Sequence, residues 1–357
     1  MTAFRIVNYL DCPQWDAFVE SHPQGTLFHT RKMIRAYSTT HLYEPLALAA
    51  VDSRGDVLAL FVATRVGLIG QWANQFTGRS IHFSEPLHIN SEAGQQALKE
   101  LMRIHDEACR RTALFTEIRP TTASALNPSF WSSLGYERKG YHNYELDLQV
   151  STDAIWKGFT GTCRRNIKRA ERRGLSVEVV PTHIHVPTLY TILKESYGNS
   201  KIPLVDISHF YSVFRELDPR QVRLSLARLD GEVIAASCFL TDAKRVYYWY
   251  AGTKRVPGIS AMASIVWDAI QHYAGTDKQI FDFCGAGWEG EDYGPGRFKA
   301  HFGGMLTNHG RYRKVYSQWR FKLADVAYAA VRGILAPRTS SVAQKKETQD
   351  SAEPANP

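Results

Sequence analysis

The sequence predicts a mixed α/β (α+β) fold of two similar domains in tandem, each built on a mixed sheet. The chain has 357 residues, more than the roughly 250–300 residues that a single hydrophobic core usually serves. Its hydrophobic content of 44% and charged content of 22% are those of a globular protein. Residues 46–62 (LALAAVDSRGDVLALFV) and 224–240 (LSLARLDGEVIAASCFL) each join two apolar runs through an Asp/Gly turn, which predicts a β-hairpin.

The same elements follow each hairpin. Apolar residues at helical spacing predict helices over 91–112 and 260–273, and short apolar runs predict strands over 113–118 and 279–284. Two copies of hairpin, helix and strand predict one domain over residues 1–150 and a second over 151–317, with the boundary near 148–160. An amphipathic helix over 318–336 is expected to pack on the domain, and the polar tail 337–357 is expected to be disordered.

The net charge indicates which kinds of partner the protein can be expected to bind. The chain has 43 Lys and Arg residues against 35 Asp and Glu residues, a net charge of +8. This favours a nucleotide, a tRNA, a phosphorylated carrier or an anionic membrane surface, and we expect no DNA partner. The five cysteines form no C-x-x-C pair, so neither a disulfide framework nor a zinc site is predicted. No apolar run reaches the roughly 18 residues of a membrane span, so we expect a cytoplasmic protein.

A dense cluster of cations lies in CRRNIKRAERRG, residues 163–174. As a helix that ends at Gly174, this segment would bury one apolar stripe and set its cations opposite, namely Arg164, Arg165, Lys168, Arg169, Arg172 and Arg173. Cations spaced i,i+4 repel one another, and a bound polyanion would offset that repulsion. We favour this interpretation over a solvated basic surface.

Several segments together resemble a known family. In the first half, FWSSLGYERKGYHNYELDL is similar to the helix, Leu-Gly-Tyr and strand that end GNAT-type acyltransferase domains. In the second half, CRRNIKRAERRG (163–174), FDFCGAG (281–287) and RFKAHFGG (297–304) occur in that order. They resemble FemAB-like proteins and the related BioF2-like acetyltransferase domain, a superfamily built from tandem GNAT folds. The resemblance extends over nearly the whole chain, to about Ser317.

The resemblance implies a substrate site in the second half. Lys299, in the F-K-x-x-F part of RFKAHFGG, matches the lysine that FemAB-like transferases associate with substrate phosphate or transition-state charge, and its neighbour Arg297 is expected to face the cleft or solvent. GNAT enzymes hold the pyrophosphate of coenzyme A on R/Q-x-x-G-x-G/A. Arg255 and Gly258 match that motif, whereas Ser260 ends it differently. The implied donor is acyl-CoA or aminoacyl-tRNA, with no tightly bound cofactor and no metal.

The residues themselves add further candidates. Strand alternation sets Asp282 opposite Phe281 and Phe283, where it would orient or deprotonate an accepting amine; a structural, hydrogen-bonded Asp is the alternative. In 246–252 alternation groups Tyr248 with Tyr250, and we expect Tyr250 to bind substrate. The glycines of FDFCGAGWEG would let backbone N–H groups face an anion.

These observations predict an N-acyltransferase. Its acceptor would be an amine of a cell-envelope precursor, from polysaccharide or peptidoglycan biosynthesis, and its expected location is the cytoplasm or the inner face of the plasma membrane. Peripheral membrane contact through the amphipathic helix and a tRNA partner remain alternatives, and the pattern predicts no particular oligomeric state. The alternative function is a non-catalytic module that keeps the GNAT fold and binds an anion, a nucleotide or RNA.

Overall fold

The computed structural model describes residues 4–67, 74–200 and 202–334. The first half contains β1 (Arg5–Asn8), α1 (Trp15–Ser21), α2 (Arg31–Ser38), β2 (Tyr43–Val51), β3 (Val57–Val66), α3 (Asn74–Thr77), β4 (Arg79–His82), β5 (Leu87–His88), α4 (Glu92–Cys109), β6 (Phe115–Ile118), α5 (Pro128–Ser133), β7 (Glu137–Lys139) and β8 (Tyr141–Asp147). Short 3-10 turns lie at Tyr9–Asp11 and Leu27–His29.

The second half repeats this plan. It contains α6 (Thr152–Gly158), α7 (Gly161–Arg172), β9 (Ser176–Val179), α8 (Thr182–Ser200), α9 (Ser208–Glu216), a 3-10 turn (Pro219–Gln221), β10 (Val222–Leu229), β11 (Glu232–Thr241), β12 (Arg245–Thr253), α10 (Ala261–Tyr273), β13 (Ile280–Asp282), β14 (Gly287–Trp288), α11 (Gly294–Ala300), β15 (Met305–Thr307), β16 (Arg311–Val315) and α12 (Gln318–Ile334).

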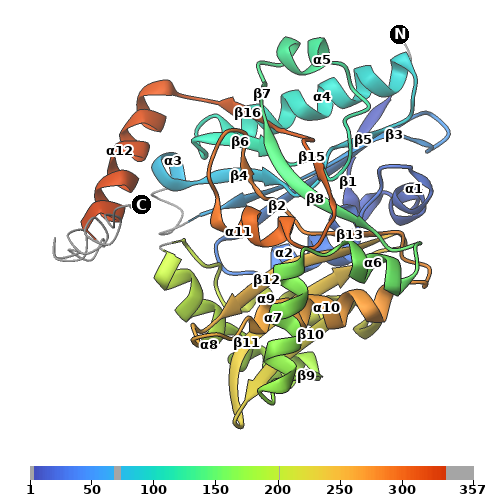
Figure 1. The fold of residues 1–357 in the computed structure, drawn as a ribbon. Helices are drawn as coiled ribbons and strands as arrows, with labels where there is room; N and C mark the ends of the chain where they lie inside the picture. Colours follow the sequence, from blue (N-terminus) through green and yellow to red (C-terminus); the bar gives the residue numbers. More distant parts are fainter. Residues whose placement is uncertain (1–3, 68–73, 201, 335–357) are drawn as a thin grey trace, which may run out of the picture.

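Two mixed sheets share one strand order. The first runs β1-β2-β3-β4-β6-β16-β7, with β5 beside β3, and the second runs β9-β10-β11-β12-β13-β8-β14, with β15 beside β8. Each is antiparallel apart from one parallel pair, β4 with β6 and β12 with β13. The hairpins, helices and strands expected from the repeat therefore occupy equivalent positions in the two sheets (Figure 1). The prediction of two tandem, similar α/β domains is confirmed.

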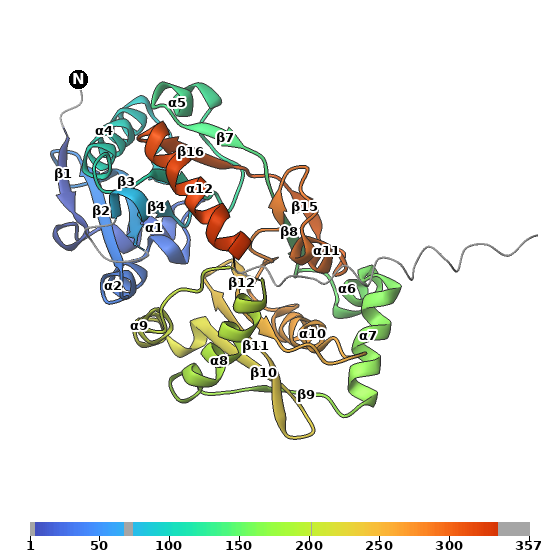
Figure 2. The same ribbon diagram turned by 90° about the vertical axis from the view of Figure 1, so that its left-hand side faces the viewer.

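The two sheets exchange one strand each. β16, from the end of the second half, lies between β6 and β7 in the first sheet. β8, from the end of the first half, pairs with β13 in the second sheet. In Figure 2, β8 and β15 lie between the two lobes of the molecule. The domain limits 1–150 and 151–317 thus remain a proposal about the duplication, and they do not coincide with the sheets.

Each sheet is covered on both faces by helices. In the first, α4 and α5 bury Leu98, Leu101 and Trp131 on one face, and α1 and α2 bury Trp15 and Ile34 on the other. In the second, α6, α7 and α10 cover one face and α8 and α9 the other. A single core cluster joins α2 to α8, α9 and the second sheet, so the halves share a continuous hydrophobic interior.

Local signals begin and end these helices where the sequence places them. The Ser91 hydroxyl accepts a hydrogen bond from the N–H of Gly94 and caps α4, and Thr160 caps α7 through the N–H of Cys163. The expected stripe of α7 is buried, and Gly174, with φ of 79°, ends the segment in the left-handed region.

The C-terminal helix departs from the expected packing. α12 rests on the first half through Phe321, whose ring lies 5.8 Å from that of Phe115, and the ring of Trp319 lies 6.3 Å from that of Phe76. Yet Trp319, Leu323 and Val326 are 65%, 54% and 67% exposed. The expectation that the apolar stripe packs on the domain is wrong for these three residues, because α12 meets the first half with the side that carries Phe321. The predicted disordered tail 337–357 lies outside the described residues.

Candidate active site

The parallel strands β12 and β13 separate and open a cavity between them. Within the described sheet they pair from Arg245 to Tyr247 and from Ile280 to Asp282, and β12 then continues to Thr253 beside β11. The cavity has a volume of about 840 Å³. Its walls include β12, most of the loop 254–260, the first residues of α10, the turn 284–285, the segment 293–299, Tyr141 and the end of α8. We call it the donor cavity.

Cations gather at the rim of the donor cavity. Lys254 and Arg255 line it, beside the N-terminus of α10. From α7, Arg173 reaches over and donates a hydrogen bond of 3.0 Å to the carbonyl of Pro257. Gly258 does not line the cavity but turns the loop, with φ of 73°. A helix N-terminus with adjacent cations suits a phosphate group.

Lys299 lies in the wall of the donor cavity, only 7% exposed. Its Nζ donates to the carbonyl oxygens of Gly285 at 2.5 Å and Cys284 at 3.3 Å, and lies 5.7 Å from the ring centre of Tyr248. Burial lowers the pKa of Lys299 to about 8. The group therefore changes charge close to neutral pH while it remains in contact with the turn after β13.

A second cavity, of about 340 Å³, lies where the two halves meet. We call it the acceptor cavity. The first half contributes Phe28, Phe83 and Arg119 to its walls, and the second half contributes Asp282 and His309, among others. The two cavities share one wall, made of Tyr141, Tyr197, Trp249, Cys284 and Gly285. Lys299 bonds to this wall from the donor side.

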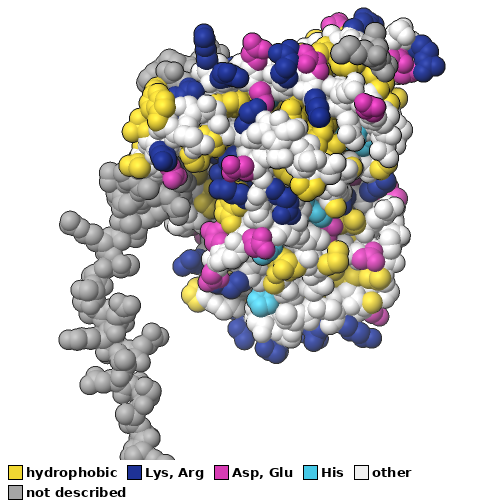
Figure 3. Space-filling model, turned by 90° about the horizontal axis from the view of Figure 1, so that it is seen from above, with side chains coloured by type: hydrophobic (Ala, Val, Ile, Leu, Met, Phe, Trp, Pro, Cys, Tyr) yellow, Lys and Arg dark blue, Asp and Glu magenta, His cyan; other side chains and the backbone are white. Residues whose placement is uncertain are grey.

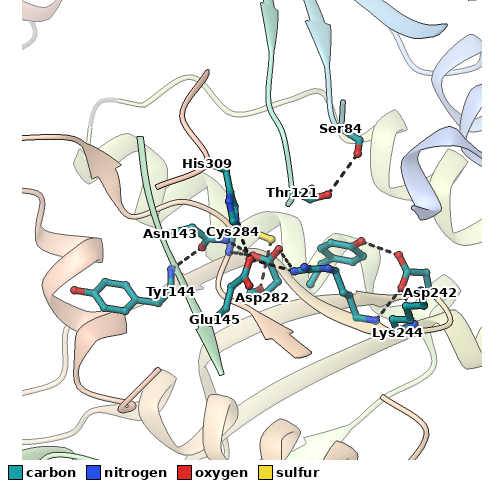
Figure 4. Close-up of polar contacts among 12 residues, drawn as sticks. Ser84, Thr121, Asn143, Tyr144, Glu145, Asp242, Lys244, Asp282, Cys284 and His309 are labelled. Carbon is teal, nitrogen blue, oxygen red and sulfur yellow. Dashed lines mark hydrogen bonds and ion pairs between the residues drawn. The ribbon is translucent and has the colours of Figure 1, made fainter. Parts of the chain in front are cut away.

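Asp282 is held at the floor of the acceptor cavity (Figure 4). It accepts hydrogen bonds from the Asn143 side chain at 2.7 Å and from the N–H of Cys284 at 2.8 Å, and Arg245 lies 3.4 Å away. Burial raises the pKa of Asp282 despite the charge of Arg245. It lies opposite Phe281, as alternation predicts, but its oxygens already have partners, which favours a positioning role.

His309 and Glu145 form a pair that sequence reasoning missed. The imidazole Nε2 of His309 lies 2.9 Å from Glu145, whose carboxylate also accepts from Arg245 at 3.2 Å. Burial opposes the charge of Glu145, but the hydrogen bond from His309 and the charge of Arg245 outweigh it and lower the pKa of this carboxyl. His309 lines the acceptor cavity, so an oriented imidazole faces the space where a substrate would lie (Figure 4).

Guanidinium groups line the opposite wall. Arg119 and Arg311 both pair with Glu117, at 2.8 and 3.0 Å. The guanidinium of Arg311 also stacks on Tyr141, 3.4 Å from its ring centre. Burial, with the nearby charge of Arg119, lowers the pKa of Arg311 to about 10. Arg311 lies 194 residues after Glu117, in no motif, and the strand exchange brings it to this wall.

The structure separates several predicted site residues from the two cavities. Arg164 caps α6 through the carbonyls of Lys157 and Phe159, and Lys168 lies over the ring of Trp156, so both have structural roles. Arg165 is exposed and bonds to Thr162. Arg297 is exposed and pairs with Asp292. None of these four cations is among the residues that line either cavity.

Tyr250 and the glycine-rich turn also differ from expectation. A β-bulge at Trp249 interrupts the alternation of β12, so Tyr250 packs with Tyr247 rather than with Tyr248 and lines the acceptor cavity. In the turn, the N–H groups of Cys284, Gly285 and Ala286 donate to Asp282, Asn143 and His142. Because these donors are already used, the turn offers carbonyl oxygens to Lys299 rather than N–H groups to an anion.

Comparison with known proteins agrees with this geometry. Residues 158–299 match the acetyltransferase (GNAT) domain family. The chain thus contains a GNAT-type domain in its second half and has a tandem GNAT-like fold. Its activity class is acyl transfer, since the matched domain is an acetyltransferase domain, and the GNAT fold implies a donor of the acyl-CoA type. No curated protein sequence matches significantly.

Solved structures share the tandem fold of this chain over most of its length. FemX superposes with a TM-score of 0.66 at 15% identity, over 89% of this chain and 99% of FemX. The C-terminal domain of a putative lysylphosphatidylglycerol synthetase from Agrobacterium fabrum superposes with a TM-score of 0.53 at 16% identity, over 91% of this chain and 96% of that domain. A tandem GNAT protein from the clavulanic acid biosynthesis pathway superposes with a TM-score of 0.51 at 12% identity, over 88% of this chain and 99% of that protein. The FemAB-like tandem fold expected from the motifs is confirmed.

Proposed function

We propose that this protein transfers an acyl group from coenzyme A, bound in the donor cavity, to an amine bound in the acceptor cavity. The observation that carries the proposal is the shared wall between the two cavities, with Lys299 on one side and His309 on the other. Two substrates that enter from opposite sides would meet at Cys284 and Gly285. The acceptor amine would belong to a cell-envelope or polysaccharide precursor, in keeping with the likeness to FemX and to a lysylphosphatidylglycerol synthetase.

The residues around this wall supply the chemistry that amide formation needs. His309, oriented by Glu145, would accept the proton that the attacking amine must lose. Lys299 in its ammonium form would stabilise the negative charge that develops on the thioester oxygen before the thiolate leaves. Asp282 would hold Asn143 and the turn at Cys284 in place. Arg255 and Lys254 would bind the pyrophosphate of the donor.

A second donor, aminoacyl-tRNA, has one observation in its favour. Arg165, Arg169 and Arg172 lie exposed on α7, away from the helix's buried stripe. Such a surface suits a phosphate backbone. The same surface would serve the alternative function, a non-catalytic module that binds RNA or another polyanion.

The exposed stripe of α12 supports a second proposal, peripheral contact with an anionic membrane surface. No helix among the described residues is long and apolar enough to cross a bilayer. Hydrophobic side chains gather on the side of the molecule where α12 lies, next to Lys and Arg side chains (Figure 3). An amphipathic helix with exposed aromatic and aliphatic residues and nearby cations suits the lipid interface.

The donor assignment is tested by measuring acetyl-CoA binding by calorimetry in three proteins. Arg255→Ala should weaken binding about tenfold, because one phosphate contact is lost. The triple reversal Arg165→Glu, Arg169→Glu and Arg172→Glu is the matched control, and it should leave acetyl-CoA binding unchanged while folding is retained. Arg173 is left intact because it supports the loop at Pro257.

Turnover then separates the remaining alternatives. Wild-type protein should acetylate small amines, and His309→Ala should lower kcat about a hundredfold with little change in acetyl-CoA affinity. Loss of activity in the triple reversal, with aminoacyl-tRNA as the only effective donor, would replace coenzyme A by tRNA. A protein that binds these ligands but turns over none of them would be the non-catalytic module.

A further inference from the structure

The acceptor cavity is electrically polarised. On one side three guanidiniums, those of Arg119, Arg311 and Arg313, surround the single carboxylate of Glu117, which leaves a net charge of +2. On the other side the one guanidinium of Arg245 pairs with the two carboxyl groups of Glu145 and Asp282. A ligand that fits this distribution carries an anionic group at one end and an amine at the other.

The positive side has donors to offer. Glu117 is buried, with its side chain 2% exposed, and its two oxygens are shared by the three arginines. A guanidinium carries five N–H groups, so a single bond from Arg119 or Arg311 to Glu117 uses only part of each. Arg311 stacks on Tyr141, and Arg119 lies 5.8 Å from the ring of Phe83. Stacking fixes the plane of the Arg311 guanidinium, which prepares its in-plane N–H groups to bind an oxyanion.

We propose that Arg119 and Arg311 clamp an oxyanion on the acceptor, so that the acceptor is a small amine that also carries a phosphate group. The proposal rests on the proposed function, because it assigns the acceptor of that reaction. Phosphate is favoured over carboxylate by the charge of +2, since a phosphate monoester carries about −1.5 to −2 at pH 7. His309 lines the same cavity beside Glu145 rather than beside Glu117, which places the base near the other end of such a molecule.

The test compares three amines that differ in their anionic group: O-phosphoethanolamine, β-alanine and ethanolamine. Calorimetry should show phosphoethanolamine binding at least about tenfold more tightly than ethanolamine, with β-alanine between them. Equal binding of all three would overturn the clamp, and tighter binding of β-alanine than of phosphoethanolamine would overturn its preference for phosphate.

The chain offers a matched control for the arginines. Arg311→Gln and Arg119→Gln should each weaken phosphoethanolamine binding about tenfold or more. Arg313→Gln removes one charge beside the same Glu117 but does not line the cavity, so it should weaken binding clearly less. Equal losses in Arg311→Gln and Arg313→Gln would overturn the clamp. If Arg311→Gln fails to fold, Arg119→Gln decides alone, because its side chain is more exposed.

Acetyl-CoA binding, measured on the same variants, keeps this inference separate from the proposed function. The donor cavity is lined by neither arginine, so acetyl-CoA affinity should not change. Wild-type protein that binds phosphoethanolamine selectively but no acetyl-CoA would support the clamp and contradict the proposed donor. Wild-type protein that binds and turns over acetyl-CoA without discriminating among the three amines would support the proposed donor and contradict the clamp.

Discussion

Lys299 shows how one residue can combine a structural and a chemical role. The RFKAHFGG motif predicts Lys299 as a site residue. The structure places its ammonium group in a buried position against two carbonyl oxygens. The residues that would work with it could not be found in the same way. Glu117, Glu145, His309 and Arg311 have ordinary sequence neighbours, and they form a site only because separate strands bring them together.

Replacement of Lys299 by Met should therefore alter both activity and the pH dependence of stability. Transfer should fall about a hundredfold, since one transition-state charge contact is lost. In wild type the folded pKa of about 8 lies below the ordinary lysine value of 10.5, so between these values the unfolded chain binds more protons. The free energy of unfolding should rise with pH through this window, by on the order of 3 kcal/mol, and Lys299→Met should lack that rise.

Urea denaturation at pH 7, 8, 9 and 10 measures this difference. Lys157→Met, on the exposed side of α6, is the control and should follow wild type. A Lys299→Met curve parallel to wild type across the window, or a variant with full activity, would contradict the role given to this lysine.

Among the secondary-structure elements, those that are determined by neighbouring residues could be predicted from the sequence. Both hairpins and the helices α4, α7 and α10 follow from apolar periodicity and caps, which a sequence displays directly. The bulge at Trp249 does not, because it depends on how β11 and β12 align. The same limit applies to α12, whose amphipathic pattern predicts an apolar stripe but not which side of the helix meets the protein.

The exposed stripe of α12 gives a prediction at this scale. Trp319→Ser, Leu323→Ser and Val326→Ser together should leave the thermal midpoint within about 2 °C of wild type, because exposed side chains contribute little to folding. Co-sedimentation with phosphatidylglycerol vesicles should be lost in this variant and should be weak for wild type with phosphatidylcholine vesicles. A large fall in the midpoint would mean that the stripe packs within the protein, and unchanged sedimentation would exclude it from membrane contact.

The whole molecule behaves as one unit, because each sheet contains a strand from the other half and one core cluster spans both. The duplication is visible in the sequence, since each copy repeats its own pattern. The strand exchange is not visible in the sequence, because the length and polarity of β8, and those of β16, do not depend on which sheet the strand enters. Domain limits drawn from repeats therefore cut through both sheets.

Two truncations test this unity. A chain of residues 1–317 keeps β16 and should unfold in one cooperative transition near the wild-type midpoint. A chain of residues 1–310 loses β16, which leaves a gap between β6 and β7 and removes Tyr312, stacked on Trp131 in the first core. Thermal unfolding by circular dichroism should show a loss of the cooperative transition, or a midpoint at least about 10 °C lower. Equal midpoints for the two chains would show that the first sheet does not need the exchanged strand.

The exchange also sets an order of events during synthesis. β6 and β7 leave the ribosome early, but β16 follows them by about 170 residues or more, roughly 10–30 s at ordinary rates of translation. Throughout that interval the nascent first sheet carries an open slot, flanked by strands whose backbone groups await a partner. The last strand to emerge closes the first sheet and brings Arg311 to its wall of the acceptor cavity. A ribosome that stalls before residue 311 would thus release a product with an unclosed edge and no finished acceptor cavity.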